Sequence, residues 1–156
     1  MADEDLLRPT LSGTGEARAL YNSTGFFVSA FFGGPMGAGV YGLANSHRLG
    51  RLRQDLPVVV VLVAGCYWLL MIATRQGWLE ALTGLLDDRS TNAIQLLLRG
   101  LALACFGAIY FMHREFYRAA RVAGVESTSG WVPGIVAVIL GLAANSAYLY
   151  WFQRHH

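Results

Sequence analysis

Long apolar stretches alternate with short charged segments along this chain. No formally charged residue occurs in 19–46, 56–74 or 127–153, and a further apolar stretch over 91–112 contains a single charge. A stretch of about 18 or more apolar residues is long enough to cross a hydrocarbon core of about 30 Å. The pattern predicts an all-α integral membrane protein, a small bundle of four transmembrane segments at about 25–46, 56–74, 91–112 and 131–152.

The ends and connections of these stretches are polar. We expect residues 1–18 to form a flexible tail, because they contain too little apolar surface to pack, and residues 19–156 to form one membrane domain. The tail opens with acidic residues, unlike a cleaved signal peptide, so the first apolar segment is expected to remain in the mature protein. Between the second and third segments, apolar residues recur at helical spacing over 75–91, which predicts a short helix in the membrane interface.

The first apolar segment is interrupted at its middle by Gly33, Gly34 and Pro35. Proline removes a backbone hydrogen bond and crowds the preceding turn, so a straight helix is not expected here. Two interpretations remain open. The first expectation is a single kinked span; the alternative is a re-entrant hairpin of two half-length helices, which places the N-terminal tail on the opposite side of the membrane.

Small residues recur four positions apart in two of the segments, a spacing that lets transmembrane helices approach closely. We expect them to pack helices together. The alternative is an ion path along the broken first segment, as in transporters with interrupted helices. The residues concerned are Gly33, Gly34, Pro35, Gly37, Gly39 and Gly42 in the first segment and Ala137, Gly141 and Asn145 in the last.

Composition supports a membrane location and excludes other classes. The chain of 156 residues is 54% hydrophobic and 14% charged, whereas soluble domains carry about 25% charged residues. A formal net charge of +2 is too small to indicate nucleic-acid binding. Cys66 and Cys105 both lie within apolar stretches, so we expect buried thiols and no disulfide framework.

Arginine placement predicts the orientation in the membrane. Basic residues cluster in cytoplasmic loops. The loops over 47–55 and 113–130 are therefore expected to be cytoplasmic, because they contain Arg48, Arg51, Arg53, Arg114, Arg118 and Arg121.

Two sets of arginines stand out as possible contact residues. Arg99 is the formal charge inside a predicted span, where it is expected to reach the interface, bind a lipid phosphate or meet a polar partner. The candidate partners are Gln95, Asn145 and a carboxylate of another subunit. Arg114, Arg118 and Arg121 share one face of a helix that we expect to continue beyond the third span to about residue 121. That face suits anionic headgroups or an acidic partner.

Candidate chemistry is sparse. The sequence contains no plausible set of nucleophile, base and acid and no phosphate-binding loop, so we expect no enzymatic activity and no cofactor. His47 and His113 fall at the same end of their spans and are the weak candidates for a metal or haem site.

The first segment resembles an N-terminal signature of small polytopic bacterial inner-membrane proteins without an assigned function. In that signature an apolar F-G-G-P segment runs into an asparagine and then L-G before a basic loop. The matching residues here are Phe32 to Pro35, Gly39, Asn45 and Leu49-Gly50. The pattern departs at 125–128, where a run of glycine and basic residues is usual. The resemblance implies a bacterial inner-membrane protein and carries no activity.

We therefore expect a small non-enzymatic accessory or interaction subunit that packs with itself or with a larger inner-membrane partner. An immunity protein that occupies a membrane toxin is a variant of this expectation. The alternatives are a channel or transporter component that uses the break at Gly33 to Gly37, and a haem or redox subunit that uses His47 and His113.

Overall fold

The computed structural model describes residues 20–78, 90–122, 124 and 127–155, and this part of the chain is helical. By length and composition alone, four helices are long and apolar enough to cross a membrane, with the first counted as one helix across its break. They lie close to the four predicted apolar stretches, which confirms the all-α class, and they comprise α1 (Ser23–Arg48), α2 (Leu52–Arg75), α4 (Ser90–Val122) and α5 (Trp131–His155). The predicted tail at 1–18 and most of the predicted interfacial helix at 75–91 lie outside the described residues.

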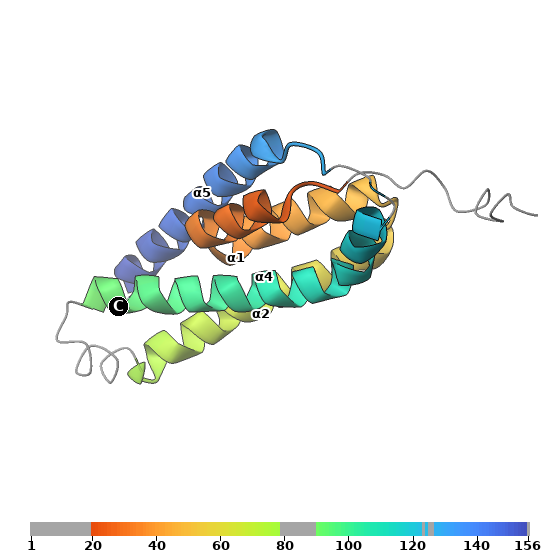
Figure 1. Cartoon of the computed structure of the whole chain (residues 1–156). Helices are drawn as coiled ribbons and strands as arrows, with labels where there is room; N and C mark the ends of the chain where they lie inside the picture. Colours follow the sequence, from red (N-terminus) through yellow and green to blue (C-terminus); the bar gives the residue numbers. More distant parts are fainter. Residues whose placement is uncertain (1–19, 79–89, 123, 125–126, 156) are drawn as a thin grey trace, which may run out of the picture.

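Helix α1 is interrupted at Gly34, whose backbone angles are φ 68° and ψ −161°. Only glycine adopts this conformation readily, because a Cβ atom would clash with the adjacent backbone. The chain reverses direction at this residue, and the two halves of α1 run back along each other (Figure 1). Gly34 therefore has a conformational role that no other residue type supplies without strain.

Contacts between the two halves establish the reversal. The Phe26 and Tyr41 rings stack with centroids 5.3 Å apart, and the Tyr41 hydroxyl donates a hydrogen bond of 2.8 Å to the carbonyl of Asn22. In one continuous helix, Phe26 and Tyr41 would be about 22 Å apart at 1.5 Å per residue. The geometry thus corresponds to the hairpin interpretation, and the first expectation, a kinked single span over 25–46, is wrong.

This hairpin is the most buried part of the described structure. In α1, 61% of the most apolar 18-residue window is buried, against 22% in α2, 22% in α4 and 17% in α5. Helix α5 lies on one side of the hairpin, and α4 and α2 lie on the other (Figure 1). The three outer helices leave large apolar side chains exposed, including Val61, Phe111 and Ile139. A surface of this kind suits lipid rather than water.

Glycines allow the outer helices to reach the hairpin backbone. Gly33 contacts Gly141 of α5 so closely that a Cβ atom on Gly141 would overlap the Gly33 carbonyl. A Cβ on Gly39 would lie 2.7 Å from Val63 of α2, and one on Gly42 would lie 2.8 Å from Ile109 of α4. The glycines of the first segment therefore serve as contact points for three different helices within the chain.

Candidate functional site

The tip of the hairpin is closed by polar contacts from two outer helices. Asn145 of α5 is buried, donates a hydrogen bond of 3.4 Å to the carbonyl of Gly33, and accepts one of 2.7 Å from the hydroxyl of Tyr67 in α2. The interruption at Gly34 frees the Gly33 carbonyl from the helix ladder, so it needs another partner in an apolar environment. Asn145 satisfies it, and the side chain of Leu98 packs against Gly34 from α4.

Asn145→Ala is expected to lower the free energy of unfolding by about 1–2 kcal/mol, because the Gly33 carbonyl and the Tyr67 hydroxyl both lose their partner. Tyr67→Phe removes one of the two hydrogen bonds of Asn145 and should lower the free energy of unfolding by less. Unfolding of the purified protein in mixed detergent micelles, followed by circular dichroism, measures both. Equal stability of wild type and Asn145→Ala would contradict this role.

A second polar cluster joins three helices near the opposite end of the hairpin. The Nε2 atom of His113 in α4 lies 3.2 Å from Oδ2 of Asp55 in α2 and 3.1 Å from Oγ of Ser46 in α1. His113 is 1% exposed and Asp55 is 4% exposed. Nε2 is thus the ring nitrogen of His113 that contacts both partners. Its other nitrogen, Nδ1, is buried and has no hydrogen-bond partner within the described part of the chain.

The sequence did not identify this cluster. Asp55 lies in the first turn of α2 and Ser46 in the last turns of α1, far from His113 along the chain. The available signal was that all three residues are polar and fall at the same end of predicted spans. His47, which we paired with His113, is exposed, whereas His113 is buried against Asp55 and Ser46. Among the described residues, no group of three or more metal-ligating side chains occurs.

Asn45 links the two ends of the hairpin to α4. Its Oδ1 atom accepts a 3.0 Å hydrogen bond from the backbone N–H of Tyr21, and its Nδ2 atom donates one of 2.9 Å to the hydroxyl of Tyr117. Arg48 lies over the Tyr21 ring at 4.5 Å. The first and last residues of α1 are therefore held next to each other. They lie on the same side of the bundle as the cluster of Ser46, Asp55 and His113.

Arg99 lies on the surface of α4 and not in a buried site. Its guanidinium carbon is 5.1 Å from the centroid of the Phe31 ring, a cation–π contact with the hairpin. No carboxylate of the described residues forms an ion pair with it. The neighbouring residue, Gly100, has nothing within 4 Å of where a Cβ atom would be. Arg99 and Gly100 thus lie side by side on an exposed surface of an apolar helix.

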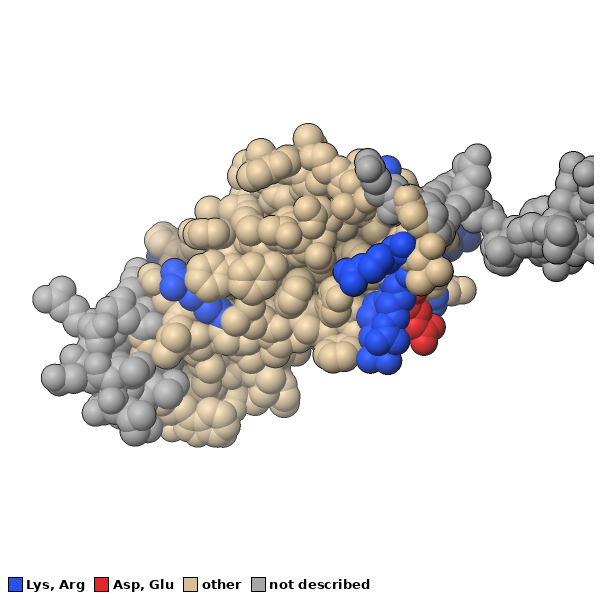
Figure 2. Space-filling view, in the orientation of Figure 1, with Lys and Arg blue, Asp and Glu red and all other residues tan. Residues whose placement is uncertain are grey.

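The basic face of α4 is exposed, as expected for residues beyond the apolar part of the helix. Arg114, Arg118 and Arg121 are all accessible, and Arg114 lies 5.9 Å from the centroid of the Phe111 ring. Figure 2 shows basic side chains gathered at the end of the molecule where α4 ends, with an acidic side chain beside them. Helix α4 continues to Val122, so part of the predicted loop over 113–130 is helical.

The polar clusters around Asn145 and His113 lie inside the described part of the chain, whereas the surface around Arg99 is open. Both polar clusters hold helices together. The exposed small-residue surface at Gly100 is part of neither cluster. Comparison of the chain with protein-family models, with curated proteins and with solved structures found no match.

Proposed function

We propose that this protein is a non-enzymatic membrane subunit that binds a partner transmembrane helix through the outer face of α4. That face consists of Leu96, Arg99, Gly100, Leu103, Ala104 and Gly107. The observation that carries the proposal is Arg99, an exposed charge about 14 Å from the start of α4 at 1.5 Å per residue. Ionisable residues within membrane spans are costly and are usually functional.

The shape of this face supports the binding of a helix. Gly100 and Gly107 are seven residues apart, about two helical turns, so they point in nearly the same direction. No atom lies within 4 Å of a Cβ position on either glycine. Leu96 and Leu103 are 52% and 38% exposed and border the glycines. A second helix can approach such a surface closely and gain dispersion contacts that lipid chains supply less well.

The rows of small residues that the sequence identified are less suited to this role. Gly33 and Gly37 of α1 and Ala137 and Gly141 of α5 contact each other or their own hairpin, so their surfaces are already covered. We therefore place the proposed contact on α4 instead of α1 or α5. The exposed glycines of α4 are not among the residues that the sequence analysis singled out by their spacing.

Arg99 favours a different protein over a second copy of this chain. A symmetric pair of copies would place the two Arg99 side chains at the same depth on facing helices, where like charges repel. A partner helix with an aspartate or glutamate at that depth would instead form an ion pair. We therefore propose a larger membrane protein with one intramembrane carboxylate as the partner; an immunity protein bound to a membrane toxin is one case of this arrangement.

Co-purification of the tagged full-length protein from its own membranes in mild detergent tests the proposal. We expect a stoichiometric membrane partner whose apparent affinity falls at least about tenfold in Arg99→Glu and in Gly100→Leu, since breaking a buried charge pair costs about 2–5 kcal/mol. Gly65→Leu is the matched control, because Gly65 in α2 also has nothing within 4 Å of its Cβ position.

Charge reversal decides the outcome. Replacing the partner's carboxylate by arginine should restore binding to Arg99→Glu and not to Gly100→Leu. Retention of the partner by Arg99→Glu and Gly100→Leu, or purification of this chain alone or as a homo-oligomer, would contradict the proposal.

We also propose an orientation in a bacterial inner membrane. The two halves of α1 are about 16 Å and 21 Å long at 1.5 Å per residue, too short to cross a core of about 30 Å, so we treat α1 as re-entrant. The positive-inside rule places the arginine-rich end in the cytoplasm. The start of α1 lies at that end, so the N-terminal tail would be cytoplasmic and the chain would cross the membrane three times.

Transport and haem binding have less support. In a transporter, backbone carbonyls at the helix break face a solvated path. Here the Gly33 carbonyl is bonded to Asn145. In a haem subunit two histidines would share a ligand, whereas His113 is bonded to Asp55.

A further inference from the structure

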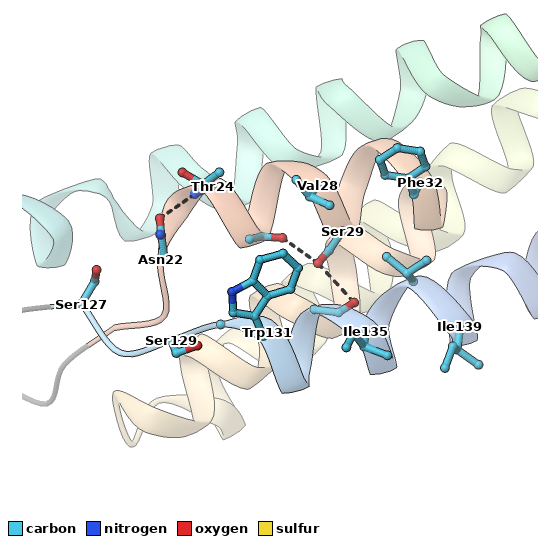
Figure 3. A pocket seen from close by; sticks show the side chains of 14 residues that line it. Asn22, Thr24, Val28, Ser29, Phe32, Ser127, Ser129, Trp131, Ile135 and Ile139 are labelled. Atoms are coloured by element: carbon cyan, nitrogen blue, oxygen red, sulfur yellow. Dashed lines mark hydrogen bonds between the residues drawn. The ribbon is translucent and has the colours of Figure 1, made fainter.

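A groove runs between the first half of α1 and the start of α5. Its volume is about 600 Å³, within the range of small-molecule sites. Figure 3 shows Val28 and Phe32 of α1 along one wall and Ile135 and Ile139 of α5 along the other. This α1–α5 groove belongs to neither polar cluster and lies apart from the α4 face proposed above as the protein-binding surface.

The groove changes from polar to apolar along its length. Asn22, Thr24, Ser127 and Ser129 lie at the end where both helices begin, and the aliphatic and aromatic side chains lie farther along them (Figure 3). Within the described part of the chain, no hydrogen bond engages the hydroxyls of Thr24, Ser127 or Ser129, and Asn22 caps α1 by accepting from the Thr24 N–H at 2.8 Å. The polar end therefore has hydroxyl donors available.

In the membrane orientation proposed above, the polar end lies at the membrane surface on the arginine-rich side. Tyr21, the residue before Asn22, is bonded to Asn45 at the end of α1, and Arg48 lies over the Tyr21 ring. Trp131, 76% exposed, stands at the same end, and tryptophan is enriched at the level of lipid headgroups. In the first turn of α5 the N–H groups of Trp131 and Val132 have no intrahelical partner, and the preceding residue, Gly130, has no side chain to cap them.

We infer that the α1–α5 groove binds one phospholipid, with an acyl chain between Val28, Phe32, Ile135 and Ile139 and the phosphodiester at the polar end. The apolar part of the groove opens toward the bilayer, whose acyl chains can fill it. Hydroxyl donors and helix N-termini match a negatively charged phosphate and would not favour an uncharged lipid. This site is independent of the proposed partner helix.

Native mass spectrometry of the full-length protein in mild detergent tests this inference, with dioleoyl phosphatidylglycerol and dioleoylglycerol as the two added lipids. They share their acyl chains and differ in the phosphate headgroup. We expect one tightly bound phosphatidylglycerol and at least about tenfold weaker binding of dioleoylglycerol, because hydrogen bonds to a charged group are lost. Equal binding of the two lipids, or no retained lipid, would overturn the inference.

Groove-filling variants locate the site. Ile135→Trp and Val28→Trp add bulk from opposite walls, and each should weaken phosphatidylglycerol binding at least about tenfold. Val136→Trp is the matched control, because Val136 is the next residue of α5, is 47% exposed and does not line the groove. Thermal unfolding identifies any variant that fails to fold, in which case the other variant decides. Wild-type binding by a folded groove variant, or equal losses in Val136→Trp, would place the lipid elsewhere.

Discussion

Gly141→Ala is expected to lower the free energy of unfolding by about 3 kcal/mol, the upper part of the range for overpacked interiors. A Cβ atom on Gly141 would overlap the carbonyl group and Cα of Gly33. All three atoms belong to backbone, so no side-chain rotation can relieve the overlap. Gly33 is also fixed by the hydrogen bond from Asn145, so α5 would have to separate from the hairpin tip.

Reversible unfolding of the purified protein in mixed detergent micelles, monitored by circular dichroism, measures this loss. Gly107→Ala is the matched control, because Gly107 of α4 has nothing within 4 Å of its Cβ position and alanine is the better helix former. Its stability should equal or slightly exceed that of wild type. A Gly141→Ala protein as stable as Gly107→Ala would show that α5 does not lie on the hairpin tip.

His113→Ala is expected to lower the free energy of unfolding by about 3–4 kcal/mol, because it removes one partner of a buried polar pair. The substitution leaves the Asp55 carboxylate buried with Arg51 as its other contact, at 4.0 Å between Nε and Oδ1. It also leaves a cavity among α1, α2 and α4 where the imidazole was 1% exposed. The loss of a buried polar partner and the loss of packing therefore both lower the free energy of unfolding.

His47→Ala is the control for this change. His47 is exposed, so its replacement should alter the free energy of unfolding by less than about 0.5 kcal/mol. The same detergent unfolding assay compares the two variants. Similar losses for His47→Ala and His113→Ala, or none for either, would contradict the assignment of His113 to a structural cluster with Asp55 and Ser46.

Much of the helical framework could be predicted from hydrophobicity. The uncharged stretches 56–74 and 127–153 correspond to α2 and α5, because a run of apolar residues about 20 long has few other stable conformations in lipid. The break in the first segment was also visible, since glycine and proline interrupt helices through local backbone chemistry. These features depend on residues close together in sequence.

The path of the chain after the break could not be predicted in the same way. A kinked span and a hairpin contain the same apolar residues at the same spacing. The choice between them depends on contacts such as Tyr41 with Asn22 and Tyr21 with Asn45, which join residues 19 and 24 positions apart. These contacts become visible only once the two halves are placed side by side.

In the candidate site, too, some features could be predicted from sequence spacing, whereas others depend on how the helices are arranged. Spacing alone identified the small residues Gly33, Ala137 and Gly141, because close approach needs no specific partner. It did not identify Ser46 and Asp55 as partners of His113, since three helices must first be arranged for these residues to meet. Exposure likewise separated Gly100 and Gly107 from the buried glycines, although all are equally small.

The distance between the two ends of α1 tests the hairpin most directly. Spin labels on Ser23→Cys and His47→Cys, both exposed, can be measured by pulsed electron spin resonance in lipid bilayers, with Cys66 and Cys105 replaced by alanine. The Tyr21–Asn45 bond of 3.0 Å places these ends side by side, so a narrow, short distance distribution is predicted. A continuous helix over the same residues would separate the two positions by about 36 Å, and a distribution centred near that value would contradict the re-entrant hairpin.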